Sequence, residues 1–213
     1  MCGRFYVEPE DSYFIELAEK MNGSPLLSLL DGKVPRDSRE RYGGEVMPGS
    51  VVPVLAPNRA GKTTVFPMRW GFSLQRTGSR RPGLMINARS ETAGVKPLFS
   101  ESWHQRRCIV PASFYFEWEH LTGPDGRKHT GQKYGIRPTG EGRTWLAGLY
   151  RLEAGIPSFV ILTRQPAADI CWIHDRMPLM LPESLTEGWI SPDSEPEKYL
   201  SDALTETCWV KAE

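Results

Sequence analysis

The sequence has few cysteines and no long apolar run. Its four cysteines are widely spaced and form no C-x-x-C pair, which argues against a zinc ribbon or a dithiol redox site. This usage fits a reducing compartment, and we expect a cytoplasmic protein. No apolar stretch approaches the roughly 20 residues needed to cross a bilayer. The amino terminus also lacks the basic and apolar regions of a secretory signal, so we expect no membrane association.

Net charge is also absent, because 26 Lys and Arg residues balance 26 Asp and Glu residues. The chain as a whole therefore gives no electrostatic sign of a nucleic-acid partner. Arginine nevertheless supplies 18 of the 26 basic residues. Its planar guanidinium suits bidentate phosphate contacts and stacking on bases. A G+C-rich genome also favours arginine codons, so composition leaves both explanations open.

Three common catalytic motifs are missing. Ala60-Gly61-Lys62-Thr63-Thr64 imitates a phosphate-binding loop, but the glycine required six residues before the lysine is replaced by Ala56. The four histidines show neither HExxH spacing nor a nearby cysteine pair, so we expect no metal and no cofactor. No G-x-S-x-G elbow is present for a serine hydrolase.

At 213 residues, 39% hydrophobic and 24% charged, the chain has the composition of an ordinary globular protein. Strands are expected at Cys2–Val7, Val51–Ala56, Val65–Phe72, Met85–Arg89, Cys108–Val110, Phe114–Trp118, Tyr134–Arg137, Trp145–Arg151, Ser158–Thr163, Pro178–Leu181 and Cys208–Lys211. Helices are expected at Glu10–Met21, Pro97–Gln105, Ala167–Ile173 and Glu195–Leu204, and loops at Gln75–Gly83 and His120–Gln132. We therefore predict one α+β domain over residues 1–213, with a mainly antiparallel, strongly bent or barrel-like sheet flanked by short helices.

Cys2 directly follows the initiator Met1. Removal of Met1 leaves a free α-amine and a thiol on adjacent carbons, a pair that no internal cysteine offers. An aldehyde reacts with such an amine to give an imine, which the thiol closes into a thiazolidine ring. The pKa of an α-amine is about 7.7–8.0, against about 10.4 for lysine, so more of it is neutral and nucleophilic at pH 7. A buried cysteine without a chemical role is the alternative.

Three internal segments place polar side chains in patterns that favour chemistry. Asn87 and Arg89 lie on one face of an extended segment, because side chains alternate along a strand. They could supply hydrogen bonds and an anion-binding group, or this face could simply be exposed to solvent. Glu117 lies among aromatic residues, where desolvation would raise its pKa. The alternative is that it lies at the end of the strand and its side chain points to solvent. His174 is the only histidine in an apolar sequence context. It is either a proton shuttle or an ordinary residue of the core.

Together these segments resemble the SOS-response-associated peptidase (SRAP) family, whose members shield abasic sites in single-stranded DNA. The resemblance is carried, in the family's order and over nearly the whole chain, by Met1-Cys2-Gly3-Arg4-Phe5, Arg69-Trp70-Gly71-Phe72, Asn87-Ala88-Arg89-Ser90-Glu91, Arg107–Trp118, Trp145-Leu146-Ala147-Gly148-Leu149-Tyr150 and His174-Asp175-Arg176-Met177-Pro178. The sequence departs from the family at Phe114-Tyr115-Phe116, where Gly-Phe-Tyr is usual. Loss of that glycine is expected to alter the strand bend near Glu117.

The resemblance implies a division of labour among the catalytic residues. After removal of Met1, expected to be autoproteolytic, Cys2 would trap the ring-opened sugar of an abasic site as a thiazolidine cross-link. Asn87 would orient the sugar or the Cys2 amine. Glu117 would protonate the ring oxygen, and His174 would shuttle protons. The imine also makes weak abasic-site lyase activity an expected side reaction.

The resemblance also implies a DNA partner, single-stranded DNA with abasic sites or its junction with a duplex, and we expect a monomeric protein. Arg4, Arg89 and Arg176 would hold phosphates. Trp70, Phe72 and Trp118 would stack on bases or wedge at the junction. Two alternatives stay open: an N-terminal-nucleophile amidohydrolase, which also begins Met-Cys-Gly, and a catalytically silent single-strand binder.

Overall fold

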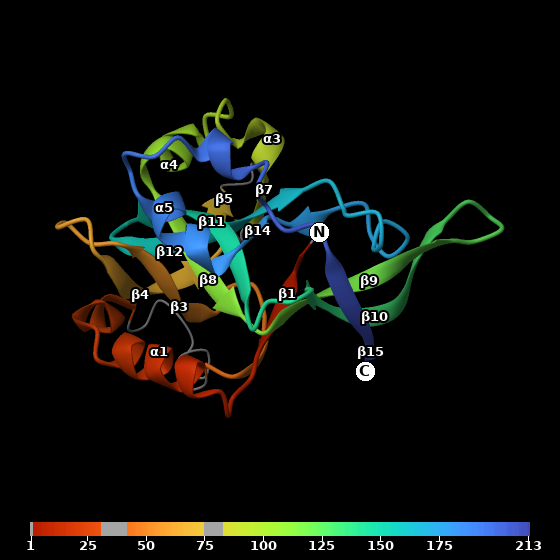
Figure 1. Cartoon of the computed structure of the whole chain (residues 1–213), viewed down its shortest axis with the longest axis horizontal. Coiled ribbons are helices and arrows are strands. Elements are labelled where there is room, and N and C mark those ends of the chain that lie inside the picture. Colours follow the sequence, from red (N-terminus) through yellow and green to blue (C-terminus); the bar gives the residue numbers. More distant parts are fainter. Residues whose placement is uncertain (1, 31–41, 75–82) are drawn as a thin grey trace.

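The computed structural model describes residues 2–30, 42–74 and 83–213, and Figure 1 shows their arrangement. The strands are β1 (Arg4–Val7), β2 (Gly44–Val46), β3 (Val51–Pro57), β4 (Thr63–Trp70), β5 (Phe72–Leu74), β6 (Gly83–Met85), β7 (Asn87–Arg89), β8 (Arg107–Ala112), β9 (Phe114–Thr122), β10 (Lys128–Pro138), β11 (Thr144–Glu153), β12 (Ile156–Arg164), β13 (Met177–Pro178), β14 (Met180–Leu181) and β15 (Thr207–Ala212). The helices are α1 (Ser12–Asn22), α3 (Ser90–Ala93), α4 (Ser100–Gln105) and α5 (Thr186–Ile190), with 3₁₀ turns η1 (Pro25–Leu30), η2 (Glu183–Leu185) and η3 (Pro196–Tyr199). The α+β prediction is confirmed.

The larger sheet closes on itself. Its hydrogen-bonded order runs β12-β4-β3-β8-β11, and β11 pairs again with β12, so these strands form a closed barrel. Because the barrel is closed, each of these strands pairs with a neighbouring strand on both of its sides. The predicted barrel-like sheet is therefore observed. β7 pairs in parallel with β12, which joins the Asn87 segment to the barrel.

The second sheet has the order β15-β10-β9-β1-β2 and is antiparallel throughout. Strands β9 and β10 form a long hairpin that extends away from the barrel (Figure 1). The loop predicted at His120–Gln132 is wrong in its extent, because pairing continues to Thr122 and resumes at Lys128. Cross-strand hydrogen bonds outweigh the polar composition of this segment.

Two predicted helices differ from the structure. Ala167–Ile173 forms a series of turns in place of a helix, with hydrogen bonds from the Ile170 N–H to the Ala167 carbonyl and from the Ile173 N–H to the Ile170 carbonyl. The predicted helix Glu195–Leu204 shortens to the 3₁₀ turn η3. Both segments are too short to gain much from helix propagation, so tertiary contacts decide their backbone. The loop predicted at Gln75–Gly83 lies, apart from Gly83, outside the described residues.

Helix α1 packs beneath the barrel through its apolar side. Phe14, Leu17 and Met21 are buried, as the helical spacing predicted. Asp11 caps its amino terminus by accepting a hydrogen bond from the Tyr13 N–H at 2.8 Å. No helix within residues 2–30, 42–74 and 83–213 is long and apolar enough to span a bilayer.

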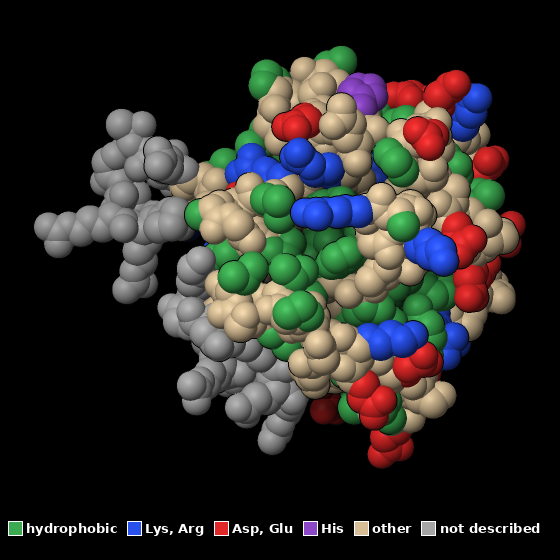
Figure 2. All heavy atoms as spheres, turned by 90° about the vertical axis from the view of Figure 1, so that its left-hand side faces the viewer, with side chains coloured by type: hydrophobic (Ala, Val, Ile, Leu, Met, Phe, Trp, Pro, Cys, Tyr) green, Lys and Arg blue, Asp and Glu red, His purple; other side chains and the backbone are tan. Residues whose placement is uncertain are grey.

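Charged side chains are distributed unevenly over the surface, although the net charge is zero. Figure 2 shows the left-hand side of Figure 1, where Lys and Arg side chains lie among hydrophobic ones in the middle of the face. Most of the acidic side chains on this face lie nearer its right-hand edge. This face therefore has a region rich in basic side chains, although the net charge of the protein is zero.

Candidate active site

Cys2 lies just before β1, and its side chain is fully buried. Asn87, at the start of β7, donates a hydrogen bond from Nδ2 to the Cys2 carbonyl oxygen at 2.8 Å. The pairing of Asn87 with Ile161 in β12 fixes this amide relative to the barrel. Its Oδ1 atom is buried and has no hydrogen-bond partner among the described residues. An unused acceptor therefore lies beside the amino-terminal backbone.

The Cys2 thiol is held in its protonated form. Burial first, and then the nearby Glu117 carboxylate, raise the pKa of the Cys2 thiol well above its ordinary value. Cys2 packs in the same core cluster as Tyr115 and Ile173, which come from β9 and from the turns after β12. A thiol in such surroundings needs a base before it can act as a nucleophile.

Glu117 is the carboxylate that its aromatic sequence context singled out. It lies on β9 between Phe116 and Trp118, pairs with Tyr134 of β10, and is only 3% exposed. Burial raises the pKa of the Glu117 carboxyl to about 7, as expected for a desolvated carboxylate. It is thus close to half protonated at neutral pH, the condition in which a carboxyl group can both give and take a proton.

His174 follows the turns after β12 and is 6% exposed. Its Nδ1 atom accepts a hydrogen bond from the Arg176 N–H at 3.0 Å, so the neutral ring carries its proton on Nε2. Nε2 lies 3.7 Å from Oε2 of Glu117. Burial first, and also His120, lower the pKa of His174 to about 4. Between the two pKa values this is a neutral imidazole beside a protonated carboxyl group rather than an ion pair.

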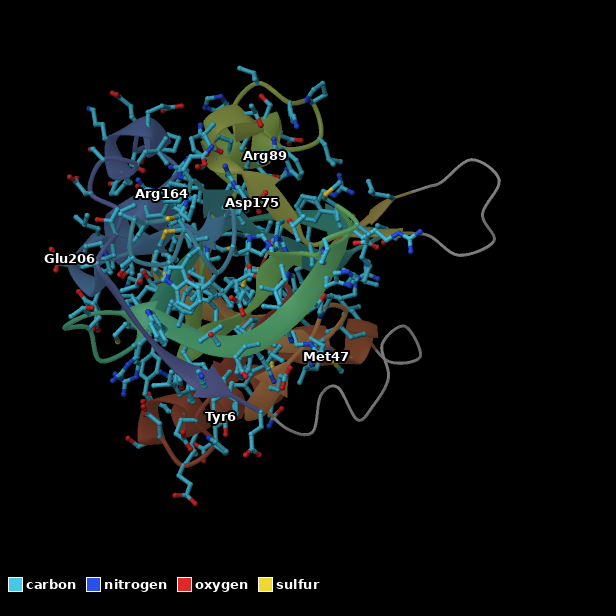
Figure 3. All side chains as sticks on the ribbon, turned by 90° about the vertical axis from the view of Figure 1, so that its right-hand side faces the viewer. Tyr6, Met47, Arg89, Arg164, Asp175 and Glu206 are labelled. Atoms are coloured by element: carbon cyan, nitrogen blue, oxygen red, sulfur yellow. The ribbon has the colours of Figure 1, made fainter. Side chains whose placement is uncertain are left out.

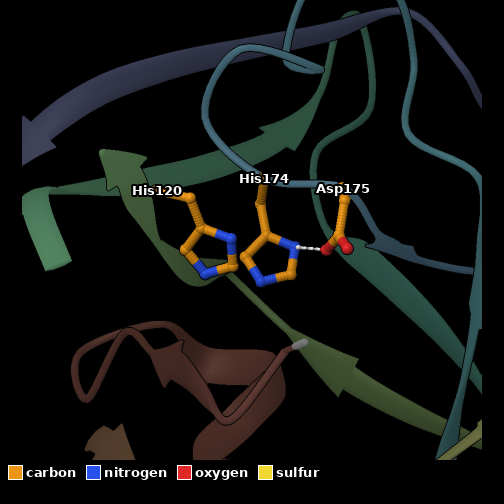
Figure 4. A group of neighbouring side chains, drawn as sticks. All are labelled: His120, His174 and Asp175. Carbon is orange, nitrogen blue, oxygen red and sulfur yellow. Dashed lines mark ion pairs between the residues drawn. The ribbon is translucent and has the colours of Figure 1, made fainter. Parts of the chain in front are cut away.

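Figure 4 shows His174 between His120 and Asp175. The His120 and His174 ring centroids are 4.0 Å apart, and Asp175 Oδ1 lies 2.9 Å from His174 Nδ1. One nitrogen or oxygen atom from each residue falls within 4.8 Å of the other two, a spacing that would admit a divalent metal. A metal on Nδ1 would displace the Arg176 N–H that already donates there. A metal on Nε2 would stand between that nitrogen and Glu117 Oε2, only 3.7 Å away, so this arrangement fits proton exchange better than coordination.

Arg89 and Arg176, both predicted to hold phosphates, differ in their surroundings. Arg89 is exposed, and in Figure 3 it lies in the same upper region of the face as Asp175. Arg176 is 6% exposed, contacts both carboxylate oxygens of Glu91 at 2.8 Å, and donates to the Thr163 carbonyl oxygen at 2.7 Å. Arg176 is therefore bound within the protein, whereas Arg89 faces solvent.

Arg4 and Trp118 lie on the opposite face of the sheet from Glu117. The Arg4 guanidinium lies 5.2 Å from the centre of the Trp118 ring and pairs with Glu45 at 2.5 Å. Both residues line an open groove together with Lys133. Because side chains alternate along a strand, β9 separates this groove from the buried carboxyl group.

Trp70 and Phe72, predicted to stack on bases, are fully buried. Trp70 stacks on Phe159 with ring centroids 6.2 Å apart and donates from Nε1 to the Ile86 carbonyl oxygen at 3.0 Å. Phe72 packs in the second core cluster, with Phe99 at 6.1 Å. Neither ring has a surface on which a base could stack in this structure, so the prediction is corrected: these side chains belong to the core.

Two residues of the site are not predicted from the sequence. The sequence predicts a loop at His120, yet its ring contacts that of His174. The register of β9 and β10 shifts between Thr130 and Lys133, and such a bulge twists a hairpin out of simple alternation. Tyr115 shares its face of β9 with Glu117, and its buried hydroxyl has no hydrogen-bond partner among the described residues. Its position two residues before Glu117 was the available signal.

The comparisons with known proteins agree on one family. The sequence model described as SOS response associated peptidase (SRAP) matches residues 1–211. The abasic site processing protein YoqW of Bacillus subtilis is 28% identical over 213 residues, covering 96% of this chain and 86% of that protein. The abasic site processing protein YedK of Escherichia coli is 29% identical over 195 residues, covering 89% of this chain and 79% of that protein.

Solved structures share the fold. A crystal structure of a protein from Bacteroides thetaiotaomicron has a TM-score of 0.66 at 21% identity and covers 100% of this chain and 92% of that one. A crystal structure of a phage-related protein from Bordetella bronchiseptica has a TM-score of 0.65 at 24% identity, with coverages of 100% and 94%. At these identities the likeness concerns the fold alone.

Proposed function

We propose, from the premise that this chain belongs to the SOS response associated peptidase (SRAP) family, that it traps abasic sites in single-stranded DNA. The trap is a covalent cross-link through Cys2 after removal of Met1. The relatives named abasic site processing proteins support a DNA substrate of this kind. The observation that carries the proposal is the convergence on Cys2 of Asn87, by a 2.8 Å hydrogen bond, and of the Glu117 carboxyl, by its electrostatic effect on the thiol.

The amine of mature Cys2 reacts before the thiol does. Burial keeps the thiol protonated, whereas an ordinary α-amine is partly neutral at pH 7. The amine adds to the sugar aldehyde and loses water to give an imine. The S–H then adds across the C=N bond, sulfur to carbon and proton to nitrogen, which closes the thiazolidine without any change of oxidation state.

Glu117 and His174 supply the proton transfers. With its pKa near 7, Glu117 can protonate the ring oxygen as the sugar opens and recover that proton later. His174, neutral at pH 7, can accept the proton that leaves the amine or the thiol. Because the imine acidifies the neighbouring carbon, weak β-elimination at the abasic site is an expected side reaction. We assign autoproteolytic removal of Met1 to the same group of residues.

DNA binding falls to exposed cationic and aromatic side chains. Arg89 is exposed, lies in the same upper region of the view as Asp175 (Figure 3), and can contact phosphate. Arg4 and Trp118 offer a second contact surface in the groove that they share with Lys133. Arg176, held by Glu91, positions the His174 segment in place of contacting DNA directly.

A cross-linking assay tests the proposal. Purified protein, with loss of Met1 verified by intact mass, is incubated with a single-stranded oligonucleotide that carries one abasic site. We expect a heat-stable adduct on a denaturing gel without added reductant. Cys2→Ala should abolish the adduct and keep binding to undamaged strand, whereas Cys171→Ala, which removes an exposed thiol, should leave the adduct unchanged.

Two outcomes would contradict the proposal. Full cross-linking by Cys2→Ala would exclude a thiazolidine at that residue. Release of ammonia from glutamine, with no adduct on abasic DNA, would favour the N-terminal-nucleophile amidohydrolase, in which the α-amine serves as base for the thiol.

A further inference from the structure

We infer that His120 is a proton-relay residue that connects the buried His174–Glu117 pair to solvent. The inference rests on the proposed function, because ring opening, imine formation and ring closure each move protons at these two groups. Glu117 is 3% exposed and His174 is 6% exposed. Neither side chain therefore exchanges protons freely with bulk water. His120, in contrast, is exposed and in contact with His174.

The contact between the two histidines is close and held by the main chain. Their ring centroids are 4.0 Å apart with the planes tilted by 53° (Figure 4). A nitrogen of His120 lies within 4.8 Å of a His174 nitrogen, a distance that one water molecule can bridge. The His120 N–H also donates to the Ile173 carbonyl oxygen at 3.0 Å. This hydrogen bond ties the β9 hairpin to the turns that carry His174, so the approach of the rings does not depend on the side chains alone.

The surroundings of His174 give a proton two successive positions. The titratable groups acting on its ring are Glu117 and His120 from β9, Asp175 from its own segment, and the amino terminus. In the neutral ring the Arg176 N–H donates to Nδ1. When Nδ1 gains a proton, it no longer accepts from the Arg176 N–H, and Asp175 Oδ1, 2.9 Å from Nδ1, accepts the new proton instead.

The relay moves one proton and no electrons. A proton enters from solvent through His120 and binds His174 at Nδ1. The Nε2–H of His174 then passes to the Glu117 carboxylate, replacing the proton given to the sugar; the 3.7 Å between these atoms must shorten to hydrogen-bond distance when DNA binds. The reverse sequence carries protons from the site to solvent. Asp175, itself exposed, stabilises the protonated ring during either passage.

The test compares His120→Gln and His120→Ala with His129→Gln, which removes an exposed histidine on the same hairpin. Rates of adduct formation on the abasic oligonucleotide are measured from about pH 5.5 to 8.5, in H₂O and D₂O. Both His120 variants should lose roughly tenfold in rate, less than the 10²–10⁴ typical of the general acid itself. Added imidazole should restore His120→Ala, and affinity for undamaged strand should not change.

Different failures have different meanings. If the His120 variants keep the wild-type rate and pH profile, or if imidazole leaves His120→Ala unchanged, the relay is wrong and the cross-linking function stands. If the wild type forms no adduct, the proposed function fails. The relay is then still judged by NMR exchange of the His174 imidazole proton with solvent: slower exchange in His120→Gln than in wild type supports it, and equal exchange overturns it.

Discussion

His174 and Glu117, with Nε2 and Oε2 3.7 Å apart, are both neutral near pH 6, because the pKa of the imidazole is lowered to about 4 and that of the carboxyl group is raised to about 7. Desolvation drives both groups toward their neutral forms, since it disfavours charge of either sign. The attraction expected of an ion pair is therefore absent between the two pKa values. A proton kept on the carboxyl group is available to a leaving or opening oxygen, which is what acid catalysis at neutral pH requires.

The pair makes a prediction about stability and pH. The raised pKa of Glu117 means that the folded state holds a proton that the unfolded state loses between pH 4.5 and about 7, so stability falls as pH rises through that window. The lowered pKa of His174 has the opposite effect between about pH 4 and 6.5, where stability rises with pH. In the wild type the two slopes largely cancel.

Single substitutions should separate the slopes. In Glu117→Gln the free energy of unfolding should rise between pH 4 and 6.5, by an amount on the order of 3 kcal/mol. In His174→Gln the free energy of unfolding should fall between pH 4.5 and about 7, the overlapping window set by Glu117. Denaturant titrations across this range measure both, with Glu119→Gln on the same strand as the control. A Glu117→Gln protein with the wild-type pH dependence would contradict the assignment of a raised pKa.

The sequence predicted the strands of the barrel and the identity of the buried acid better than the arrangement around them. Apolar and aromatic runs such as Arg107–Trp118 reveal buried strands because their burial is a property of the segment itself. His120 contacts His174 beside a register shift between β9 and β10, and no local pattern in the sequence encodes either feature. The prediction for Trp70 and Phe72 is wrong because an aromatic side chain looks the same in sequence whether it packs in a core or stacks on DNA.

Arg89 and Arg176 should respond differently to substitution. Arg89→Ala should weaken binding to undamaged single strand and reduce the slope of log affinity against log salt by about 0.7 for each lost phosphate contact. Arg176→Ala should instead destabilise the fold by about 1–3 kcal/mol, because the Thr163 carbonyl oxygen and Glu91 lose their shared donor. Fluorescence anisotropy at several salt concentrations and thermal unfolding distinguish these effects. Equal salt slopes for wild type and Arg89→Ala would remove Arg89 from the DNA surface.

The Tyr115 hydroxyl makes a prediction about stability. It is buried and has no hydrogen-bond partner among residues 2–30, 42–74 and 83–213, and burial raises its pKa well above the ordinary value. An unsatisfied buried hydroxyl costs about 1–3 kcal/mol. Tyr115→Phe should therefore raise the melting temperature, whereas Tyr134→Phe, on the partner strand, serves as the comparison. A lower melting temperature for Tyr115→Phe would mean that the hydroxyl is satisfied in solution.

Asn87 should affect the rate of adduct formation more than the affinity for DNA. Its Nδ2 holds the Cys2 carbonyl at 2.8 Å, and its Oδ1 is free to accept a hydrogen bond from the sugar or the Cys2 amine. Asn87→Ala releases the amino-terminal segment, and loss of reacting geometry of this kind can slow a reaction by about 10²-fold.

Gel-based cross-linking rates at saturating DNA measure this effect of Asn87→Ala. Asn58→Ala is the matched control, because Asn58 makes its hydrogen bonds within the β3–β4 turn. Asn87→Asp keeps the Oδ1 acceptor but replaces the donor to Cys2 by a second acceptor, so its rate should resemble that of Asn87→Ala if holding the carbonyl is what matters. A rate for Asn87→Asp close to wild type would instead assign the main role to the Oδ1 acceptor, and unchanged rates in both variants would exclude Asn87 from the reaction.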